Sequence, residues 1–362
     1  MGFGTHVLAL LLVFTLTLLI IANGDPQVPC YFIFGDSLMD NGNNNNLLTQ
    51  AKVNFPPYGI DFPDGPTGRF SNGRNIADVI AQLLGFKSSI PPFATAKGEE
   101  LISGVNYASG AAGIRDETGL HMGGRICLGN QIKNHLITIL RLSYLIGKGS
   151  LVETRKYLSQ CIYTVGMGNN DYINNYFVPK YYQTSIRYTP EQYAQVLIKQ
   201  YSAQLQELYR HGARKFGIFA PGQCGCTPGM MATYGVNSCV EEVNNAILLF
   251  NARLNTTIDD LNNKLIDAKF VLINTLHGYP NDINVTDTPC CEISNTNGKG
   301  NCIPNKVPCS NRQNYFFWDS FHPTERVSIL DGTKAYESLY PLYSFDAISS
   351  SASNDTGYVS DA

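Results

Sequence analysis

Four short segments of the 362-residue chain carry side chains that together can cleave an ester. A serine hydroxyl is a poor nucleophile near neutral pH, so it needs a base to remove its proton during attack. Ser37, in Gly35-Asp36-Ser37, is the candidate nucleophile, and His322 is the candidate base. Asp319 lies three residues before His322, which allows one turn of chain to bring its carboxylate against the imidazole. These residue types predict a serine hydrolase that uses Ser37, His322 and Asp319.

The tetrahedral intermediate of such a reaction carries an oxyanion that needs hydrogen-bond donors. The predicted donors are the backbone N–H groups of Ser37 and Gly110 and the side-chain amide of Asn170. Each donor is worth on the order of 3 kcal/mol in the transition state. Taken alone, each segment is more often an ordinary turn, because Ser, Asn and Asp bond readily to nearby backbone. The interpretation therefore depends on finding all four segments in this order.

The elements that must position these residues form an alternating pattern. Helical patterns over 76–84, 189–212 and 240–265 separate short apolar runs at 30–34, 101–108, 161–165, 215–219 and 270–274. This alternation is typical of a parallel sheet covered by helices on both faces. The carboxyl ends of such strands share one rim, where Ser37, Gly110 and Asn170 would meet. We predict an α/β fold: a three-layer α/β/α sandwich with a five-stranded parallel sheet.

The first 24 residues predict export. Residues 7–21 are almost entirely apolar, are short for a membrane span, and end in the small residues Ala22-Asn23-Gly24. We interpret residues 1–24 as a secretory signal peptide; the alternatives are a retained anchor or a buried helix. Residues 25–362 are expected to form one domain, although their length also permits two. No comparable apolar run follows, so we predict a secreted, extracellular protein without a transmembrane anchor after signal removal.

Cysteine usage agrees with export, because ten cysteines are many for a reduced compartment. Disulfides are expected in the polar loop that holds Cys290, Cys291, Cys302 and Cys309. The alternative there is zinc, which the adjacent Cys290-Cys291 pair matches poorly. Cys226 and Cys239 are expected to pair, whereas Cys30 and Cys161, each at the start of an apolar run, are expected to be buried free thiols. Expected glycosylation acceptors are Asn255, Asn284 and Asn354.

Charge and motif patterns exclude several other functions. A net charge of -3 with 15% charged residues leaves no basic stripe for nucleic acid and no polybasic membrane patch. Gly166-Met167-Gly168 begins like a dinucleotide-binding motif, but no third glycine opens a helix. The remaining histidines share no ligand spacing. We therefore expect no metal, no nucleotide cofactor and no nucleic-acid partner.

The ordered motifs resemble the plant GDSL esterase/lipase family, within the SGNH hydrolase superfamily. Similarity covers essentially the mature chain, in blocks at residues 32–44, 68–74, 106–110, 168–172, 212–216 and 317–325. The resemblance implies a flavodoxin-like fold and cleavage of carboxylic esters without metal or cofactor. It also implies the triad Ser37, Asp319 and His322, with oxyanion donation by Ser37, Gly110 and Asn170.

The chain departs from the usual family pattern at several places. Many relatives read Ser-Gly-Gly-Ala where this chain reads Ser109-Gly110-Ala111-Ala112, so the backbone donor is the N–H of either Gly110 or Ala111. The stretch 274–290, which is expected to border the cleft, is shorter than in typical relatives. The substrates of relatives are therefore a weak guide to the substrate of this chain. Cys224 is an additional thiol.

The leading functional prediction is a secreted serine esterase that acts through an acyl-enzyme. Its substrate would be a small-molecule or polymer-bound ester, such as an acyl lipid or an acylated cell-wall sugar or metabolite. Two alternatives remain open. An acyltransferase would pass the same acyl group to an alcohol, and a binding protein would keep the fold without turnover.

Overall fold

The structure is a computed structural model that describes residues 25–274, 279–294 and 300–344. The predicted signal peptide and the acceptor Asn354 lie outside these ranges, and the assignment of 25–362 to one domain stays a prediction. Among the described residues, no helix combines the length and apolar character needed to cross a bilayer.

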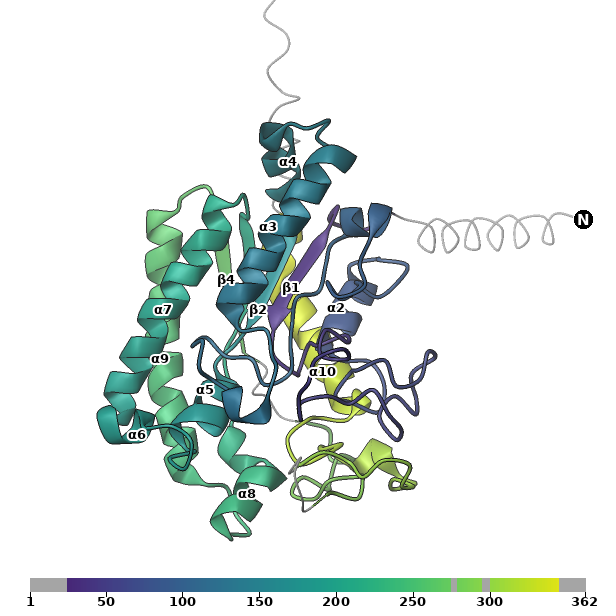
Figure 1. The fold of residues 1–362 in the computed structure, drawn as a ribbon, viewed down its shortest axis with the longest axis vertical. Helices are drawn as coiled ribbons and strands as arrows, with labels where there is room; N and C mark the ends of the chain where they lie inside the picture. Colours follow the sequence, from purple (N-terminus) through teal and green to yellow (C-terminus); the bar gives the residue numbers. More distant parts are fainter. Residues whose placement is uncertain (1–24, 275–278, 295–299, 345–362) are drawn as a thin grey trace, which may run out of the picture.

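A parallel sheet lies at the centre of the molecule (Figure 1). Its strands are β1 (Tyr31–Gly35), β2 (Ile162–Gly166), β3 (Lys215–Phe219) and β4 (Lys269–Ile273), in the order β1-β2-β3-β4. The register pairs Gly35 with Gly166, Gly166 with Phe219, and Phe219 with Ile273. The carboxyl ends of all four strands are therefore level, and the loops that follow them leave from one edge.

The prediction of a fifth strand at 101–108 is wrong, because this segment does not form a regular strand. Its first part lies in the 3₁₀ helix η1 (Gly98–Ser103), and only Asn106 forms a bridge to Ile33. The chain nevertheless runs parallel to β1, because Tyr107 N–H donates to Ile33 O and Ser109 N–H to Gly35 O. The ladder does not extend further, because the Gly35 N–H, which would otherwise donate to Tyr107 O, donates to Gln131 Oε1 at 3.0 Å.

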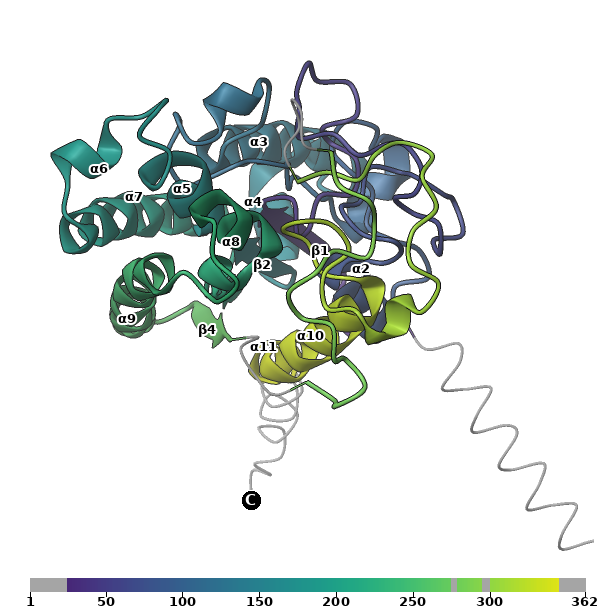
Figure 2. The same cartoon turned by 90° about the horizontal axis from the view of Figure 1, so that it is seen from below.

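Helices cover both faces of the sheet, as predicted for a three-layer fold. Successive strand residues point to opposite sides. Phe32 and Phe34 pack in one core with α3 (Leu128–Leu145), α7 (Pro190–Arg210) and α9 (Glu241–Lys264). Tyr31 and Ile33 pack in a second core with α2 (Ile76–Leu83) and α10 (Glu325–Ser338). Figures 1 and 2 show these two helical layers on either side of the strands.

Helix boundaries follow the capping signals in the sequence. Asn75 and Asp78 form a reciprocal capping box at the start of α2, and Thr189 and Gln192 do the same for α7. The remaining α-helices are short: α4 (Leu151–Leu158), α5 (Asn169–Asp171), α6 (Thr184–Arg187), α8 (Pro228–Tyr234) and α11 (Tyr340–Tyr343). Further 3₁₀ helices are η2 (Leu120–Met122), η4 (Cys224–Cys226) and η5 (Arg312–Asn314), and η3 (Tyr172–Tyr176) is a single π-helical turn.

Disulfides confirm part of the cysteine prediction and overturn the rest. Cys226–Cys239, Cys290–Cys309 and Cys291–Cys302 are bonded, so disulfides rather than zinc hold the polar loop. Cys30 and Cys161, predicted as free thiols, are also bonded to each other. They precede Tyr31 and Ile162, which are paired neighbours on β1 and β2, so sheet formation places their Cα atoms 4.8 Å apart. Among the described cysteines, Cys127 and Cys224 are free and buried.

Two loop regions far apart in sequence lie side by side below α2 and α10 (Figures 1 and 2). One is residues 36–75, and the other is the described part of 279–323. They are joined by an ion pair between Asp61 and Arg312 and by a hydrogen bond from Asn301 to Gln50 O. This packing brings the segment after β1 to the segment before α10.

Candidate active site

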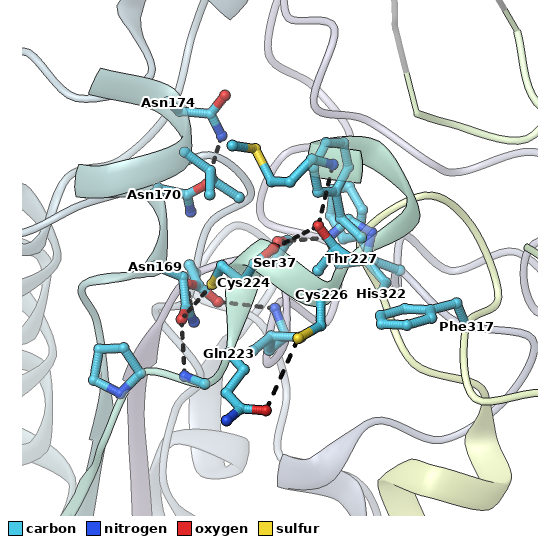
Figure 3. Close-up of a pocket in the computed structure, with 18 of the residues that line it drawn as sticks. Ser37, Asn169, Asn170, Asn174, Gln223, Cys224, Cys226, Thr227, Phe317 and His322 are labelled. Atoms are coloured by element: carbon cyan, nitrogen blue, oxygen red, sulfur yellow. Dashed lines mark hydrogen bonds between the residues drawn. The ribbon is translucent and has the colours of Figure 1, made fainter. Parts of the chain in front are cut away.

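A cleft of about 1400 Å³ opens at the carboxyl edge of the sheet. Its lining includes Ser37 after β1, Asn170 after β2 and His322 before α10. Figure 3 shows Ser37 next to His322, with Asn170 on the opposite wall. The position agrees with the rule that open α/β sheets bind ligands beyond the carboxyl ends of their strands.

Ser37, His322 and Asp319 form one continuous hydrogen-bonded row. Ser37 Oγ lies 2.7 Å from His322 Nε2. On the other side of the ring, His322 Nδ1 lies 2.8 Å from both Asp319 Oδ1 and Oδ2. A carboxylate can only accept, so Nδ1 carries the proton and Nε2 is left to accept from the serine hydroxyl. The structure thus brings together the three residues that the sequence predicted.

Local backbone bonds shape the loop that holds His322. The backbone N–H groups of Phe321 and His322 both donate to Asp319 Oδ1 at 2.9 Å. Trp318 N–H donates to His322 O at 2.8 Å, which closes the turn. The Phe70 ring lies against the imidazole, with ring centroids 4.7 Å apart. The side chains of Asp319 and His322 are buried, so both are held with little freedom to rotate.

The Asn170 side chain is buried at the start of α5 with its amide oriented by two neighbours. Asn174 donates to Asn170 Oδ1 at 2.6 Å, and Asn170 Nδ2 donates to Ala112 O at 2.9 Å. A carboxamide nitrogen carries two protons, so one N–H remains for the cleft.

Gly110 lies beside the cleft, but its N–H is already engaged. It donates to Asp40 Oδ2 at 2.9 Å. The next residue, Ala111, lines the cleft in a left-handed conformation with φ 63°. Within the described chain, the N–H groups of Ala111 and Ser37 have no hydrogen-bond acceptor. Of the two backbone donors left open by the sequence, Ala111 is the one whose N–H is available.

Comparison with known proteins assigns the chain to a family. The family described as GDSL-like lipase/acylhydrolase matches residues 31–328.

The chain belongs to the GDSL esterase/lipase family.

Three GDSL esterases/lipases of Arabidopsis thaliana illustrate the similarity. They are 46%, 45% and 47% identical to this chain, over 91%, 88% and 87% of its length and 93%, 90% and 88% of their own. The protein is therefore a member of a carboxylic ester hydrolase family. Among solved structures, a carbohydrate acetylesterase from Sinorhizobium meliloti is similar with a TM-score of 0.39 and 11% identity, covering 86% of this chain and 99% of its own. The family assignment rests on the family match and on the sequence relatives.

A group of apolar side chains lines part of the cleft. They come from the turn after α5, from α8 and from the His322 loop, and they are Ile173, Phe177, Val178, Met230, Met231, Phe317 and Phe321. Tyr279, Thr286 and Asp287 also line the cleft, so the stretch 274–290 borders it as expected. Part of that stretch lies outside the described residues.

Burial raises the pKa of two groups near the candidate nucleophile. Asp36 precedes Ser37, and burial raises the pKa of its carboxyl above the ordinary value. Cys224 Sγ donates to Asn169 Oδ1 at 3.2 Å, and burial raises the pKa of this thiol to about 12. A thiol with that pKa stays protonated at neutral pH, so Cys224 is no competing nucleophile.

Sequence reasoning did not identify Tyr58. Its hydroxyl donates to Asp319 Oδ2 at 2.6 Å, although the two residues are 261 positions apart. Nothing in the Pro57-Tyr58-Gly59 segment points to Asp319, so only the folded chain reveals this contact.

Of the other predicted sites, the acceptors Asn255 and Asn284 are exposed. In the part of the chain that the structure describes, no cluster of three or more His, Cys, Asp or Glu side chains is suited to hold a metal ion.

Proposed function

We propose that this family member is an exported serine esterase that cleaves carboxylic esters through an acyl-enzyme on Ser37. The observation that carries the proposal is the row from Ser37 Oγ through His322 to Asp319, with distances of 2.7 and 2.8 Å. Four disulfides support export, because such bonds persist in oxidising compartments.

The proposed reaction begins when Ser37 Oγ attacks the ester carbonyl and its proton passes to His322 Nε2. Asp319 stabilises the imidazolium that forms. The C–O bond to the alcohol then breaks, and His322 returns the proton to the departing oxygen. Water attacks the acyl-enzyme with His322 again as the base, which releases the acid and restores the Ser37 hydroxyl.

For the oxyanion, we infer three donors: the N–H groups of Ser37 and Ala111 and the amide of Asn170. Ala111 replaces Gly110 in this role because Asp40 already accepts from the Gly110 N–H. Asp40 is buried and also accepts from the N–H groups of Gly42 and Asn43, so it fixes the loop after Ser37 to the Gly110 turn.

The cleft supports an acyl ester with an extended apolar part as the substrate. A volume of about 1400 Å³ exceeds what a short acetyl ester needs, and seven apolar side chains named above line the cleft. Burial of each methylene contributes about 0.8 kcal/mol, so catalytic efficiency should rise with acyl length until the chain fills the cleft.

Hydrolysis of p-nitrophenyl esters from acetate to palmitate tests the proposal. Ser37→Ala should lower kcat by at least about 10⁴-fold, because the nucleophile and its base act as a unit. Ser238→Ala is the matched control, since Ser238 also lines the cleft but is exposed. An organophosphonate should label the wild type and the control but not Ser37→Ala. Substantial turnover by Ser37→Ala would refute the assignment of the nucleophile.

A further inference from the structure

Tyr58 connects the candidate triad to a distant part of the chain. Its side chain is fully buried, and its hydroxyl lies 2.6 Å from Asp319 Oδ2. The same hydroxyl oxygen accepts from the backbone N–H of Cys302 at 3.1 Å. A backbone N–H can only donate, so the hydroxyl oxygen accepts a hydrogen bond from Cys302 and donates its own proton in a hydrogen bond to Asp319.

The two oxygens of the Asp319 carboxylate are held differently. Oδ1 accepts from the N–H groups of Phe321 and His322, within its own loop. Oδ2 accepts from Tyr58, the one hydrogen-bond donor outside this loop that reaches the carboxylate among the described residues. Two fixed oxygens define the plane of the carboxylate, and that plane sets the direction in which His322 Nδ1–H must point.

Tyr58 is itself rigidly packed. Its ring makes edge contacts with Phe55, Phe70 and Trp318, with centroids 5.5, 6.5 and 6.5 Å away. Cys302 is bonded to Cys291, whose N–H donates to Trp318 O next to Asp319. The disulfide loop therefore holds both the tyrosine oxygen and the backbone beside the carboxylate.

The Tyr58 hydroxyl also stays protonated, and therefore remains a hydrogen-bond donor, at neutral and moderately alkaline pH. Burial, and then the negative charge of Asp319, raise the pKa of Tyr58 well above its ordinary value. A neutral phenol beside a carboxylate gives a charge-assisted hydrogen bond, which is stronger than a neutral one.

We propose that Tyr58 is a positioning residue: its hydroxyl holds Asp319 in the orientation that aims His322 Nε2 at Ser37. The inference rests on the proposed function, because it assigns Tyr58 a role in the same reaction. Tyr58 touches neither the substrate nor the reacting atoms, so its effect passes through Asp319 and His322.

Tyr58→Phe tests this role, because it removes the hydroxyl and keeps the ring. We expect kcat to fall by about tenfold to a hundredfold, since each factor of ten corresponds to about 1.4 kcal/mol and bonds to charged groups are worth more than that. KM should change by less than about twofold, because the cleft wall is intact. The rate of organophosphonate labelling should fall together with kcat.

Tyr107→Phe is the matched control. Tyr107 is also fully buried, and its hydroxyl contacts His135 Nδ1 in the helix-covered core. This variant loses a buried hydroxyl of the same kind but should keep kcat. An unchanged kcat in Tyr58→Phe, or a change confined to KM, would show that Tyr58 has no positioning role.

A second measurement covers the case in which Tyr58→Phe does not fold. Site-specific 3-fluorotyrosine keeps the ring and the hydroxyl but makes the hydroxyl a stronger donor. The low-field proton resonance of His322 Nδ1–H should shift with this substitution at position 58 and stay in place with it at position 107. Identical spectra would contradict the inference.

Ser37→Ala in the same assays separates the two proposals. If wild-type turnover and labelling do not depend on Ser37, the proposed function is wrong and the role of Tyr58 with it. If they depend on Ser37 while Tyr58→Phe keeps its kcat, only the positioning role is wrong.

Discussion

At the scale of single residues, the Asn170 amide is the candidate oxyanion donor whose orientation is most firmly fixed. Its oxygen is bound by Asn174 and one of its N–H groups by Ala112 O, so the direction of the second N–H is set before substrate arrives. A donor that needs no reorganisation contributes more to the transition state than one that must be oriented during the reaction.

Asn170→Ala should therefore lower kcat by about 10²- to 10³-fold, the range for loss of one oxyanion donor. KM should change little, because the ground-state carbonyl makes a weaker bond than the oxyanion. Steady-state kinetics on a p-nitrophenyl ester measure both values. Asn237→Ala is the control, since Asn237 lines the same cleft and is exposed. A loss of less than tenfold would exclude Asn170 as an oxyanion donor.

The residues that the sequence identified share one property: their signals are local. Asp319 lies within one turn of His322, and Ser37 and Asn170 each follow a strand of a parallel sheet, whose carboxyl ends share one edge, so local patterns were sufficient to bring them together. The engagement of the Gly110 N–H by Asp40 and the contact of Tyr58 with Asp319 join segments 70 and 261 positions apart. Such contacts depend on tertiary packing and leave no pattern in the sequence.

At the scale of elements, the start of α2 secures the loop that covers the candidate base. Arg69 makes a two-point ion pair with Asp78, with both contacts at 2.7 Å and both side chains buried. Asp78 also accepts from the Asn75 N–H in the capping box. The next residue along from Arg69 is Phe70, which packs on His322, so the helix cap and the site share one support.

Arg69→Ala should destabilise the fold by about 3–5 kcal/mol, because it leaves the buried Asp78 carboxylate without its partner. Urea unfolding followed by circular dichroism measures the free energy of unfolding. Lys334→Ala is the control: Lys334 pairs with Glu337 at 3.2 Å, but both side chains are more than half exposed. That variant should differ from wild type by less than about 1 kcal/mol. Equal effects of the two variants would contradict the structural role of Arg69.

Element-level predictions succeeded where the apolar periodicity was helical over several turns, as for α2, α7 and α9. They failed for the predicted fifth strand, where the Gly35 N–H that would extend the ladder donates to the Gln131 side chain instead. The free-thiol prediction for Cys30 and Cys161 failed because it needed the order of strands in the sheet. Once β1 and β2 are known to be neighbours, the disulfide follows from their register.

At the scale of the whole molecule, the candidate catalytic groups gather at the sheet edge, and buried carboxylates in and around the same cleft couple stability to pH. Burial raises the pKa of Asp331, on α10, to about 7, and Tyr279 donates to its Oδ1 at 2.8 Å. Burial likewise raises the pKa values of Asp40 and Asp171 to about 6. All three bind a proton more tightly in the folded state than in the unfolded chain.

The sign of the effect follows from this difference. A carboxyl with a raised folded pKa adds stability below its unfolded value of 3.8, and that stability is lost as pH rises through about 7 for Asp331. Asparagine resembles the protonated acid and does not titrate. Asp331→Asn should therefore match wild type near pH 4 and exceed its stability at pH 8 by about 2–4 kcal/mol.

Urea unfolding of Asp331→Asn and wild type from pH 4 to pH 8 measures this difference directly. Asp40 and Asp171 titrate in both proteins, so their contributions cancel in the comparison, and the divergence between the two curves belongs to position 331. Asp64→Asn, on an exposed loop, removes a charge of the same kind and should run parallel to wild type throughout. If Asp331→Asn also runs parallel to wild type, burial does not raise the pKa of the Asp331 carboxyl in the folded protein.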